Sequence, residues 1–461
     1  MATIDWKARA ERISQRLERL AEITDEPGKL TRTLLSPAMA EATQLAAGWM
    51  QEAGLQTSID FIGNLVGRTP GIRREPMSPT PDAEGSRGRG AQHRTFLIGS
   101  HLDTVRDAGR FDGGLGVILG IEIADIFRSG FDLPFALMIA GFSDEEGVSF
   151  QTAYLGSRAF CGLLRPEDLE VSNREGSLRQ LLIDTQTRRA VSPAKVQLGR
   201  TTAEVSQVGI KAEPEFRLPR GTVDRDQLVG YFEIHIEQGP VLEDRNLPVG
   251  VVTAIAGQSR FRFNWTGKAA HAGTTPVALR KDALLGAARF ALRTEDACSR
   301  FPGLVATVGE LNVSPNVSNV VPGRVTHSLD VRHQEDSVRD AAIAWLCQEA
   351  DQIAAERKLG LERLLVQDTP SVVCNPDFIT RLAAAAKSVT GDSFQLPSGA
   401  GHDAVVLSQL CPAGMLFVRC RDGLSHHPDE FVQVDDIEVA LRTAVRFMES
   451  FGLQDPRSIS D

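Results

Sequence analysis

The 461-residue chain lacks any long apolar run and any excess of positive charge. Its most apolar window, LGVILGIEIADIF, contains Glu122 and Asp125 and is shorter than the roughly 20 residues that cross a bilayer, so we expect no membrane span. The formal net charge is -10, whereas nucleic-acid binding relies on clustered Lys and Arg that neutralise phosphates. We therefore expect neither a membrane nor a nucleic acid as a partner.

The chain also lacks paired cysteines and several motifs of nucleotide-binding proteins and serine hydrolases. Its six cysteines include no C-x-x-C pair, which predicts reduced thiols. The N-terminal segment MATIDWKARAERISQRLERL is charged throughout and has no apolar signal-peptide core, so we expect a cytoplasmic protein. No G-x-S-x-G elbow, Walker loop or G-x-G-x-x-G is present, which disfavours serine-hydrolase and nucleotide-binding functions.

Four short apolar runs stand between helical stretches, which is typical of strands buried on both faces of a mostly parallel sheet. They occupy residues 96–99, 133–142, 231–236 and 414–418. Residues 4–23 and 37–53 have the apolar spacing of amphipathic helices. The predicted fold class is therefore α/β, with a mostly parallel central sheet.

The region from residue 258 to about 366 has a different pattern. Its strand, helix, strand, strand, helix order suggests a smaller α+β domain inserted into the α/β domain. We place the α/β domain at residues 1–253 and 371–461 and the inserted domain at residues 254–370. The stretch 69–93 is rich in Pro, Gly, Ser and Arg, so we interpret it as a mobile surface insertion, and 184–227 is similarly polar.

Acidic and histidine residues lie at the end of each predicted strand. They are His101 and Asp103 for the first strand, Glu145 and Glu146 for the second, His235 for the third, and the adjacent His426 and His427 for the fourth. Ligands of open α/β sheets bind beyond the carboxyl ends of the strands, so these side chains are expected to form one site. Such a concentration of polar groups is costly unless cations compensate it, and imidazole with carboxylate suits zinc, manganese or cobalt.

Asp112, in GRFDGGLGV, could join this set or could simply cap the helix that follows, and the cap is the more ordinary interpretation. Asp103 lies two residues after His101 and could accept the other ring N–H of that histidine, which would fix its tautomer. Adjacent Glu145 and Glu146 point in different directions. One could bind a metal while the other takes a proton from water, although neighbouring acids are usually only surface residues.

A family resemblance adds to this interpretation. In this order, the chain contains GSHLDTV, GRFDGGLGV, FSDEEGVSFQ with LGSRAF, YFEIHIEQGPVLE, GKAAHAGTTP, SNVVPG, PSGAGHDA and GLSHHPDE. Together they resemble the metal-dependent amidohydrolases that include allantoate amidohydrolase, N-carbamoyl-L-amino acid hydrolase and the ureidopropionase type, in the aminoacylase and carboxypeptidase group. The resemblance implies hydrolysis of the carbamoyl C–N bond of a small carboxylic acid, with allantoate as the leading substrate and ammonia and carbon dioxide as products.

The resemblance also implies two divalent metal ions per subunit, zinc or manganese, with cobalt or nickel as alternatives. One ion would be held by His101, Asp112 and His235, and the other by Asp112, Glu146 and His426, with Glu145 as the general base and acid. The motif alignment favours His426 over its neighbour His427 as the ligand.

Substrate-binding residues follow from the same resemblance: Gln238, Arg260, Asn319, Arg332, Gly399 and His402. By residue type alone, Arg260 and Arg332 would be surface ion pairs, and His402 could instead support its glycine-rich loop. The inserted domain would act as a lid and would form a homodimer. His271 on this domain would reach the active site of the partner subunit and stabilise the developing oxyanion.

Other functions stay open at this point. Close alternatives are an N-carbamoyl-L-amino acid hydrolase, a ureidopropionase or a ureidoglycolate amidohydrolase. More distant alternatives are an aminoacylase, a dipeptidase or a non-catalytic binding protein.

Overall fold

The structure is a computed structural model that describes residues 4–70, 94–128, 133–191, 219, 221–223 and 225–452. The stretch 69–93 lies almost wholly outside these residues, and so does the middle of the stretch 184–227, into which α5 (Leu178–Val191) extends. The chain divides into two compact units. The first comprises Met1–Val251, Asn375–Gln395 and His402–Asp461, and the second comprises Val252–Cys374 and Leu396–Gly401.

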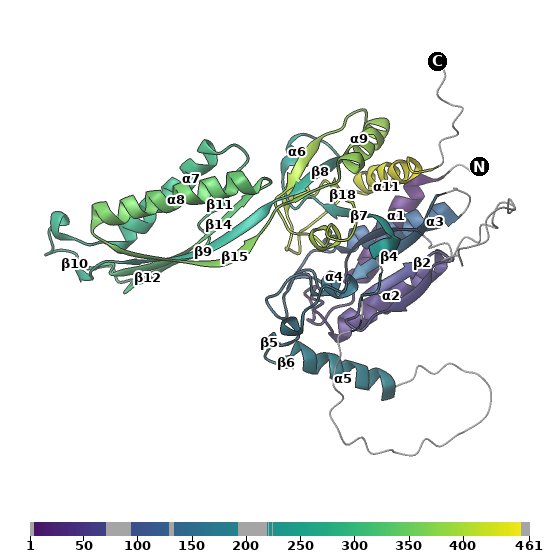
Figure 1. Cartoon of the computed structure of the whole chain (residues 1–461), viewed down its shortest axis with the longest axis horizontal. Coiled ribbons are helices and arrows are strands. Elements are labelled where there is room, and N and C mark those ends of the chain that lie inside the picture. Colours follow the sequence, from purple (N-terminus) through teal and green to yellow (C-terminus); the bar gives the residue numbers. More distant parts are fainter. Residues whose placement is uncertain are drawn as a thin grey trace, which may run out of the picture. The chain divides into compact units, whose positions relative to one another are not determined.

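The largest sheet contains all four predicted apolar runs (Figure 1). Its strands are β1 (Gln56–Ile59), β2 (Leu65–Arg68), β3 (Thr95–His101), β4 (Ala136–Phe142), β7 (Leu228–Ile236), β8 (Val249–Ile255), β16 (Val372–Val373), β17 (Gln395–Ser398) and β18 (Ala413–Val418). The order is β1-β2-β4-β3-β7-β18-β8-β16, with β17 paired to β8. Strands β4, β3, β7 and β18 are parallel neighbours. The predicted α/β class with a mostly parallel sheet is therefore confirmed.

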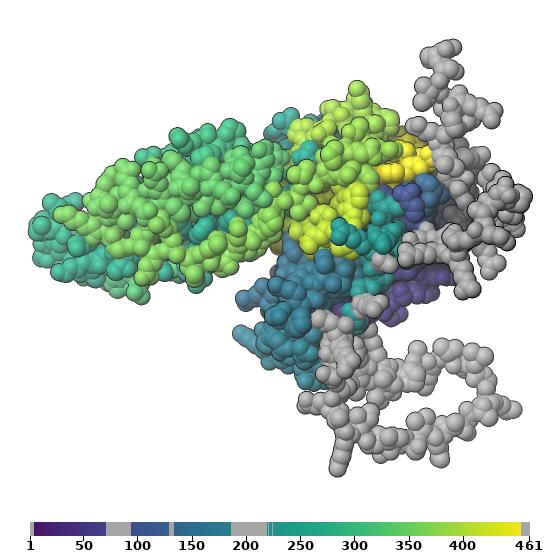
Figure 2. Space-filling model, viewed as in Figure 1, coloured from purple at the N-terminus to yellow at the C-terminus, as the bar shows by residue number. Residues whose placement is uncertain are grey.

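Helices of the first unit pack around this sheet. They are α1 (Trp6–Ala21), α2 (Pro37–Glu52), α3 (Gly114–Arg128), α4 (Leu155–Phe160), α6 (Val241–Asp244), α9 (Pro376–Thr390), α10 (Ala404–Leu407) and α11 (Val434–Glu449). Asp5 and Ser36 cap α1 and α2, because their side chains accept hydrogen bonds from Ala8 N and Met39 N. The C-terminal α11 packs against α1, so yellow atoms lie beside purple ones in Figure 2.

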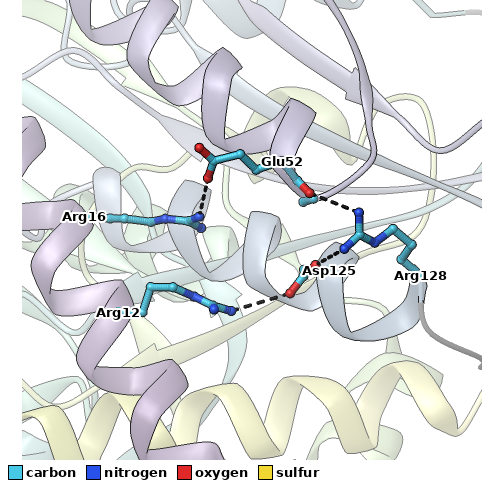
Figure 3. A pocket seen from close by; sticks show the side chains of 6 residues that line it. Arg12, Arg16, Glu52, Asp125 and Arg128 are labelled. Atoms are coloured by element: carbon cyan, nitrogen blue, oxygen red, sulfur yellow. Dashed lines mark hydrogen bonds and ion pairs between the residues drawn. The ribbon is translucent and has the colours of Figure 1, made fainter.

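The acidic residues of the apolar α3 are paired with arginines. Glu122 is fully buried and accepts hydrogen bonds from Arg9 and Arg12 of α1. Figure 3 shows a pocket that is lined by Arg12 and by further charged residues of the three helices. In it, Arg16 of α1 contacts Glu52 of α2 at 3.2 Å. This network ties α1, α2 and α3 together. Among the helices that the structure describes, none combines the length and the apolar character needed to cross a membrane.

The second unit is built on an antiparallel sheet with two helices over one face (Figure 1). The strands are β9 (Gly257–Thr266), β11 (Val305–Thr307), β12 (Leu311–Ser314), β14 (Arg324–His333) and β15 (Gly360–Thr369), and the helices are α7 (Ala283–Arg300) and α8 (Asp336–Arg357). The order β11-β14-β9-β15, with β12 paired to β14, places β15 at an edge. The sequence prediction omitted β12 and β15, and neither strand has the alternating burial that is typical of a half-buried strand.

The core of the second unit contains an aromatic stack around one histidine. The ring of His327 lies flat against Phe263, with centroids 5.1 Å apart, and close to Phe290. Trp265 Nε1 donates to His327 Nε2 at 2.9 Å, and His327 Nδ1 donates to the carbonyl of Ser328 at 3.0 Å. Burial lowers the pKa of His327, so this ring is a neutral core residue.

Candidate metal centre

Parallel strands bring all five predicted metal ligands to one edge of the sheet. His101 is the last residue of β3, and His235 lies one residue before the end of β7. Glu146 and His426 follow β4 and β18, and Asp112 precedes α3. Nitrogen and oxygen atoms of His101, Asp112 and His235 lie within 4.8 Å of one another, as do those of Asp112, Glu146 and His426. A third such group joins His101 and Glu146 to Glu145.

The two buried histidines have defined tautomers. His101 Nδ1 donates to the carbonyl of Asp103 at 3.0 Å, and His235 Nδ1 donates to the carbonyl of Ile236 at 2.9 Å. In both rings Nε2 is therefore the nitrogen that faces the site, and the two Nε2 atoms lie only 3.4 Å apart. Two ring nitrogens this close in a buried site need positive charge beside them, which a proton or a metal ion can supply, so the pair fits a metal ion.

Asp112 offers one carboxylate oxygen to each ligand set. Its Oδ1 lies 3.1 Å from His235 Nε2 and 3.9 Å from His101 Nε2, and its Oδ2 lies 3.2 Å from His426 Nε2. Among the described residues, no hydrogen bond joins this carboxylate to the first turn of α3. Gly113 makes the approach possible, because a Cβ there would lie 2.4 Å from the His101 ring and its φ is +64°.

The second set is completed by Glu146 and His426. Glu146 Oε1 lies 3.3 Å from His426 Nε2. His426 has a φ of +58°, a conformation that side chains rarely adopt and that directs its ring toward Asp112. His427 is exposed, and its Nδ1 accepts the backbone N–H of Asp429 at 3.2 Å. Of the two adjacent imidazoles, only that of His426 contacts the other candidate ligands in the described part of the chain.

Electrostatics in this cluster favour positive charge at the imidazole nitrogens. Burial opposes ionisation of Asp112, yet hydrogen bonds from His235 and His426 hold its pKa well below the usual range. Burial likewise opposes charge on His101, but the Asp103 carboxylate raises the pKa of this histidine well above its usual value. Hydrogen bonds to Asp112 and Glu146 raise the pKa of His426 to about 10. The donor types and this charge preference together fit divalent cations.

The loop that carries Glu145 and Glu146 is fixed from two directions. The carboxylate of Asp103 accepts the backbone N–H of Glu145 at 3.1 Å and that of Glu146 at 3.2 Å. Asp103 thus acts mainly on this loop, since its carboxylate is 3.5 Å from His101 Nδ1 while its carbonyl takes the closer bond. Asn64, which the sequence interpretation missed, accepts from Ser143 N at 2.9 Å and donates to a carbonyl in α4.

Glu145 is a buried carboxyl group beside the candidate ligands. Its side chain is only 8% exposed, and this burial raises its pKa well above the usual range, with His101 partly opposing the shift. A carboxyl group with a raised pKa can take and return a proton near neutral pH.

Gln238 and His402 contact two of the candidate ligands directly. Gln238 has a φ of +57°, and its Nε2 donates to Asp112 at 3.2 Å and to Ser425 at 3.1 Å. The sequence interpretation gave Gln238 a substrate contact and did not foresee this one. His402 is buried with its ring centroid 4.6 Å from that of His235, and burial lowers its pKa well below the usual value.

In the second unit, Asp330 holds both predicted substrate arginines. Arg260 Nε donates to it at 2.9 Å, and Arg332 donates through Nε at 2.9 Å and Nη2 at 3.0 Å. Arg332 Nη1 also donates to the carbonyl of Gly399 at 2.6 Å. Both arginines are therefore paired with Asp330, yet their side chains remain 48% and 30% exposed. Because two guanidinium groups share one carboxylate, one positive charge is left over. This arrangement is suited to an anionic ligand.

His271 and Asn319 are neighbours elsewhere in the second unit. His271 lies on β10 (Ala270–His271), which pairs with β13 (Val320–Val321), and Ala272 N donates to the carbonyl of Asn319. His271 Nδ1 accepts the backbone N–H groups of Gly273 and Thr274 at 3.1 and 3.2 Å. The exposed Nε2 of neutral His271 therefore carries the proton and can donate.

This fold and this cluster define a hydrolase of a known family. Residues 97–450 match the peptidase family M20/M25/M40, and the chain belongs to this family. It is an amidohydrolase-type enzyme that acts on a C–N bond other than a peptide bond.

Individual relatives narrow the comparison. The chain is 36% identical to allantoate deiminase 2 of Glycine max over 466 residues, which is 94% of this chain and 88% of that protein. It is 37% identical to the N-carbamoyl-L-amino acid amidohydrolase of Geobacillus stearothermophilus over 431 residues, with 93% and 95% covered. The crystal structure of an amidase of the hydantoinase/carbamoylase family from Burkholderia multivorans superimposes with a TM-score of 0.81 at 30% identity, with 96% and 98% covered.

Proposed function

We propose that the chain hydrolyses the carbamoyl C–N bond of a small ureido acid, with allantoate as the leading substrate, and that it releases ammonia and carbon dioxide. The observation that carries this proposal is Asp112, which offers one oxygen to each of two ligand sets beside the raised-pKa carboxyl group of Glu145. The similarity to allantoate deiminase of Glycine max supports the choice of substrate.

Two divalent cations, zinc or manganese with cobalt or nickel as alternatives, are proposed for this centre. His101, Asp112 and His235 would hold one, and Asp112, Glu146 and His426 would hold the other. When bound, such ions lower the pKa of water from about 15.7 to near 7 and polarise a carbonyl group. Glu145 takes a proton from the attacking water and returns it to the departing nitrogen.

The remaining roles concern binding of the substrate. Arg260 and Arg332 bind its carboxylate through the guanidinium groups that Asp330 aligns. Asn319, Gln238, Gly399 and His402 are proposed to complete the substrate site. His271 donates from Nε2 to the oxyanion that develops on the carbamoyl carbon, which is an electrostatic contribution of about 3 to 4 kcal/mol in comparable sites.

An N-carbamoyl-L-amino acid is the second candidate substrate, because the Geobacillus stearothermophilus relative named for this reaction is as similar as the allantoate deiminase. Both molecules present a ureido group next to a carboxylate, so the same arginines and cations suit both.

An ammonia-release screen tests the proposal. Protein purified without chelator is supplied with Zn²⁺ or Mn²⁺ and assayed on allantoate, N-carbamoyl-L-amino acids, 3-ureidopropionate and dipeptides. The highest kcat/KM is expected on allantoate. A preference for carbamoyl amino acids would select the second candidate, and turnover of dipeptides alone would contradict both. Metal analysis of the same protein identifies the native ion.

A reducing, cytoplasmic compartment stays our prediction for the location of the protein.

A second copy of this chain is the proposed partner. The support for a dimer is β15, an edge strand of ten residues with the apolar side chains Leu364, Leu365 and Val366 more than half exposed. An apolar edge strand of this length is a template for pairing with another chain. Sedimentation should give a dimer, and Leu365→Lys should give a monomer.

Mixing two inactive variants tests whether His271 acts across the dimer. Glu145→Gln subunits supply His271, and His271→Ala subunits supply Glu145. Co-refolded heterodimers should recover activity if the histidine serves the partner's site. No recovery in heterodimers isolated with two affinity tags would contradict this role.

A further inference from the structure

Glu430 is a buried carboxylate that the motif analysis left without a role. It follows β18, four positions after His426, and is 1% exposed. Its Oε1 accepts the backbone N–H groups of Phe111 at 2.7 Å and Asp112 at 3.0 Å, 318 positions away from the latter. One side chain thus joins the loop that carries Asp112 to the loop that carries His426.

Ser425 extends this connection to the carboxylate of Asp112. Its Oγ lies 3.3 Å from Glu430 Oε2 and 3.0 Å from Asp112 Oδ2. Gln238 Nε2 donates to the same serine oxygen at 3.1 Å and reaches both oxygens of Asp112. Residues of the loop that follows β18 therefore contact both the backbone N–H and the carboxylate of Asp112.

Gly109 shows how closely Glu430 packs against the Asp112 loop. A Cβ at position 109 would lie 2.3 Å from the Cβ and Cδ atoms of Glu430. Any larger residue at this position must displace the Glu430 side chain, because the clash involves the base of that side chain as well as its end.

We propose that Glu430, acting with Ser425, is a positioning residue that sets the orientation of the carboxylate shared by the two ligand sets. The inference rests on the proposed function, because it takes Asp112 as a ligand of both cations. A shared carboxylate must direct one oxygen to each set, so rotation of Asp112 weakens both. Loss of such outer contacts typically reduces metal affinity by about 10- to 100-fold.

Metal affinity measured without turnover tests this proposal. Metal-free wild-type protein and the variants Glu430→Ala, Glu430→Gln and Ser425→Ala are titrated with Co²⁺ against a chelating indicator, and the visible absorption of bound Co²⁺ is recorded. Glu430→Ala should lose about 10- to 100-fold in affinity with a changed spectrum. Glu430→Gln should recover part of the loss, because its amide oxygen can still accept the two backbone N–H groups.

Two matched controls separate positioning from folding. Glu237 is also buried and accepts two backbone N–H groups at 2.8 Å, those of Val241 and Leu242 in α6, so Glu237→Gln should leave the Co²⁺ affinity within threefold. Gly109→Ala should mimic Glu430→Ala, whereas Gly48→Ala, which meets no atom within 4 Å, should change nothing.

The outcomes distinguish this inference from the proposed function. If wild-type protein binds no Co²⁺, the proposed metal centre fails. If wild-type protein binds two equivalents and folded Glu430→Ala and Ser425→Ala bind them equally well, the positioning role is overturned. If Glu237→Gln loses as much affinity as Glu430→Ala, the effect is general destabilisation and the positioning role is again overturned.

Discussion

Replacement of Glu145 by glutamine separates proton transfer from metal binding. Glu145→Gln keeps the size of the side chain and the backbone N–H bonds to Asp103, and it leaves all five proposed ligands in place. It removes a buried carboxyl group that neither of the two proposed ligand sets uses. Because general base catalysis contributes about 10²- to 10⁴-fold, loss of this group should lower kcat by that factor, which corresponds to about 3 to 5 kcal/mol in the barrier.

The same variant should not lose stability. Burial and the neighbouring carboxylates of Glu146 and Asp103 raise the pKa of Glu145, so its charged form is disfavoured in the fold. A neutral amide relieves this repulsion, and the free energy of unfolding of the metal-free protein should stay equal or increase.

Glu146→Gln is the matched comparison, because Glu146 is the adjacent residue and a proposed ligand. It should lose one equivalent of metal and regain activity at high metal concentration, whereas Glu145→Gln should hold two equivalents at all concentrations. Steady-state kinetics together with metal analysis measure both. Glu145→Gln with a kcat within threefold of wild type, or a reversed pattern of metal loss, would refute the assignment.

Three further predictions concern the surrounding structure. Arg332→Lys removes the two-point contact of a guanidinium group, so KM for the ureido acid should rise by about 10- to 100-fold with kcat nearly unchanged, and equal kinetics would contradict its role. Glu122→Gln removes a buried carboxylate charge that Arg9 and Arg12, themselves partly exposed, neutralise, and it should lower the free energy of unfolding in urea by about 2 to 3 kcal/mol without changing the metal content; an unchanged midpoint would show that the pairs contribute nothing. The pKa of His327 is lower in the folded protein than in the unfolded chain, so as the pH falls the unfolded chain is protonated at this residue before the folded protein is. The stability that neutral His327 contributes is therefore complete above about pH 6.5, the usual pKa of histidine, and is lost as the pH falls toward the pKa of the folded state. Thermal melts between pH 8 and pH 5 should therefore decline more steeply for wild type than for His327→Phe, and parallel declines would exclude this histidine as the source.

The central sheet could be predicted because its strands are buried on both faces. Strands β3, β7 and β18 read as near-continuous apolar runs, and their parallel direction follows from the helices between them. The same geometry predicts that polar residues at the carboxyl ends meet, so His101, His235 and the Glu145 loop could be assigned to one site before any coordinates.

Other parts of the site leave no pattern in the sequence. Glu430 acts through backbone N–H groups 318 and 319 positions away, and any residue type could supply those groups. The contact of Gln238 with Asp112 depends on a left-handed backbone at Gln238, which the residue types around it do not indicate. Strand β15 was missed because seven consecutive exposed residues, from Glu362 to Asp368, hide the period of two that marks a half-buried strand.

Anomalous diffraction from crystals of the metal-loaded protein is the most direct measurement of the metal centre. We expect two peaks in each subunit, one at His101 and His235 and one at Glu146 and His426, each about 2.0 to 2.2 Å from an oxygen of Asp112. A single peak, or two peaks of which only one touches Asp112, would contradict it.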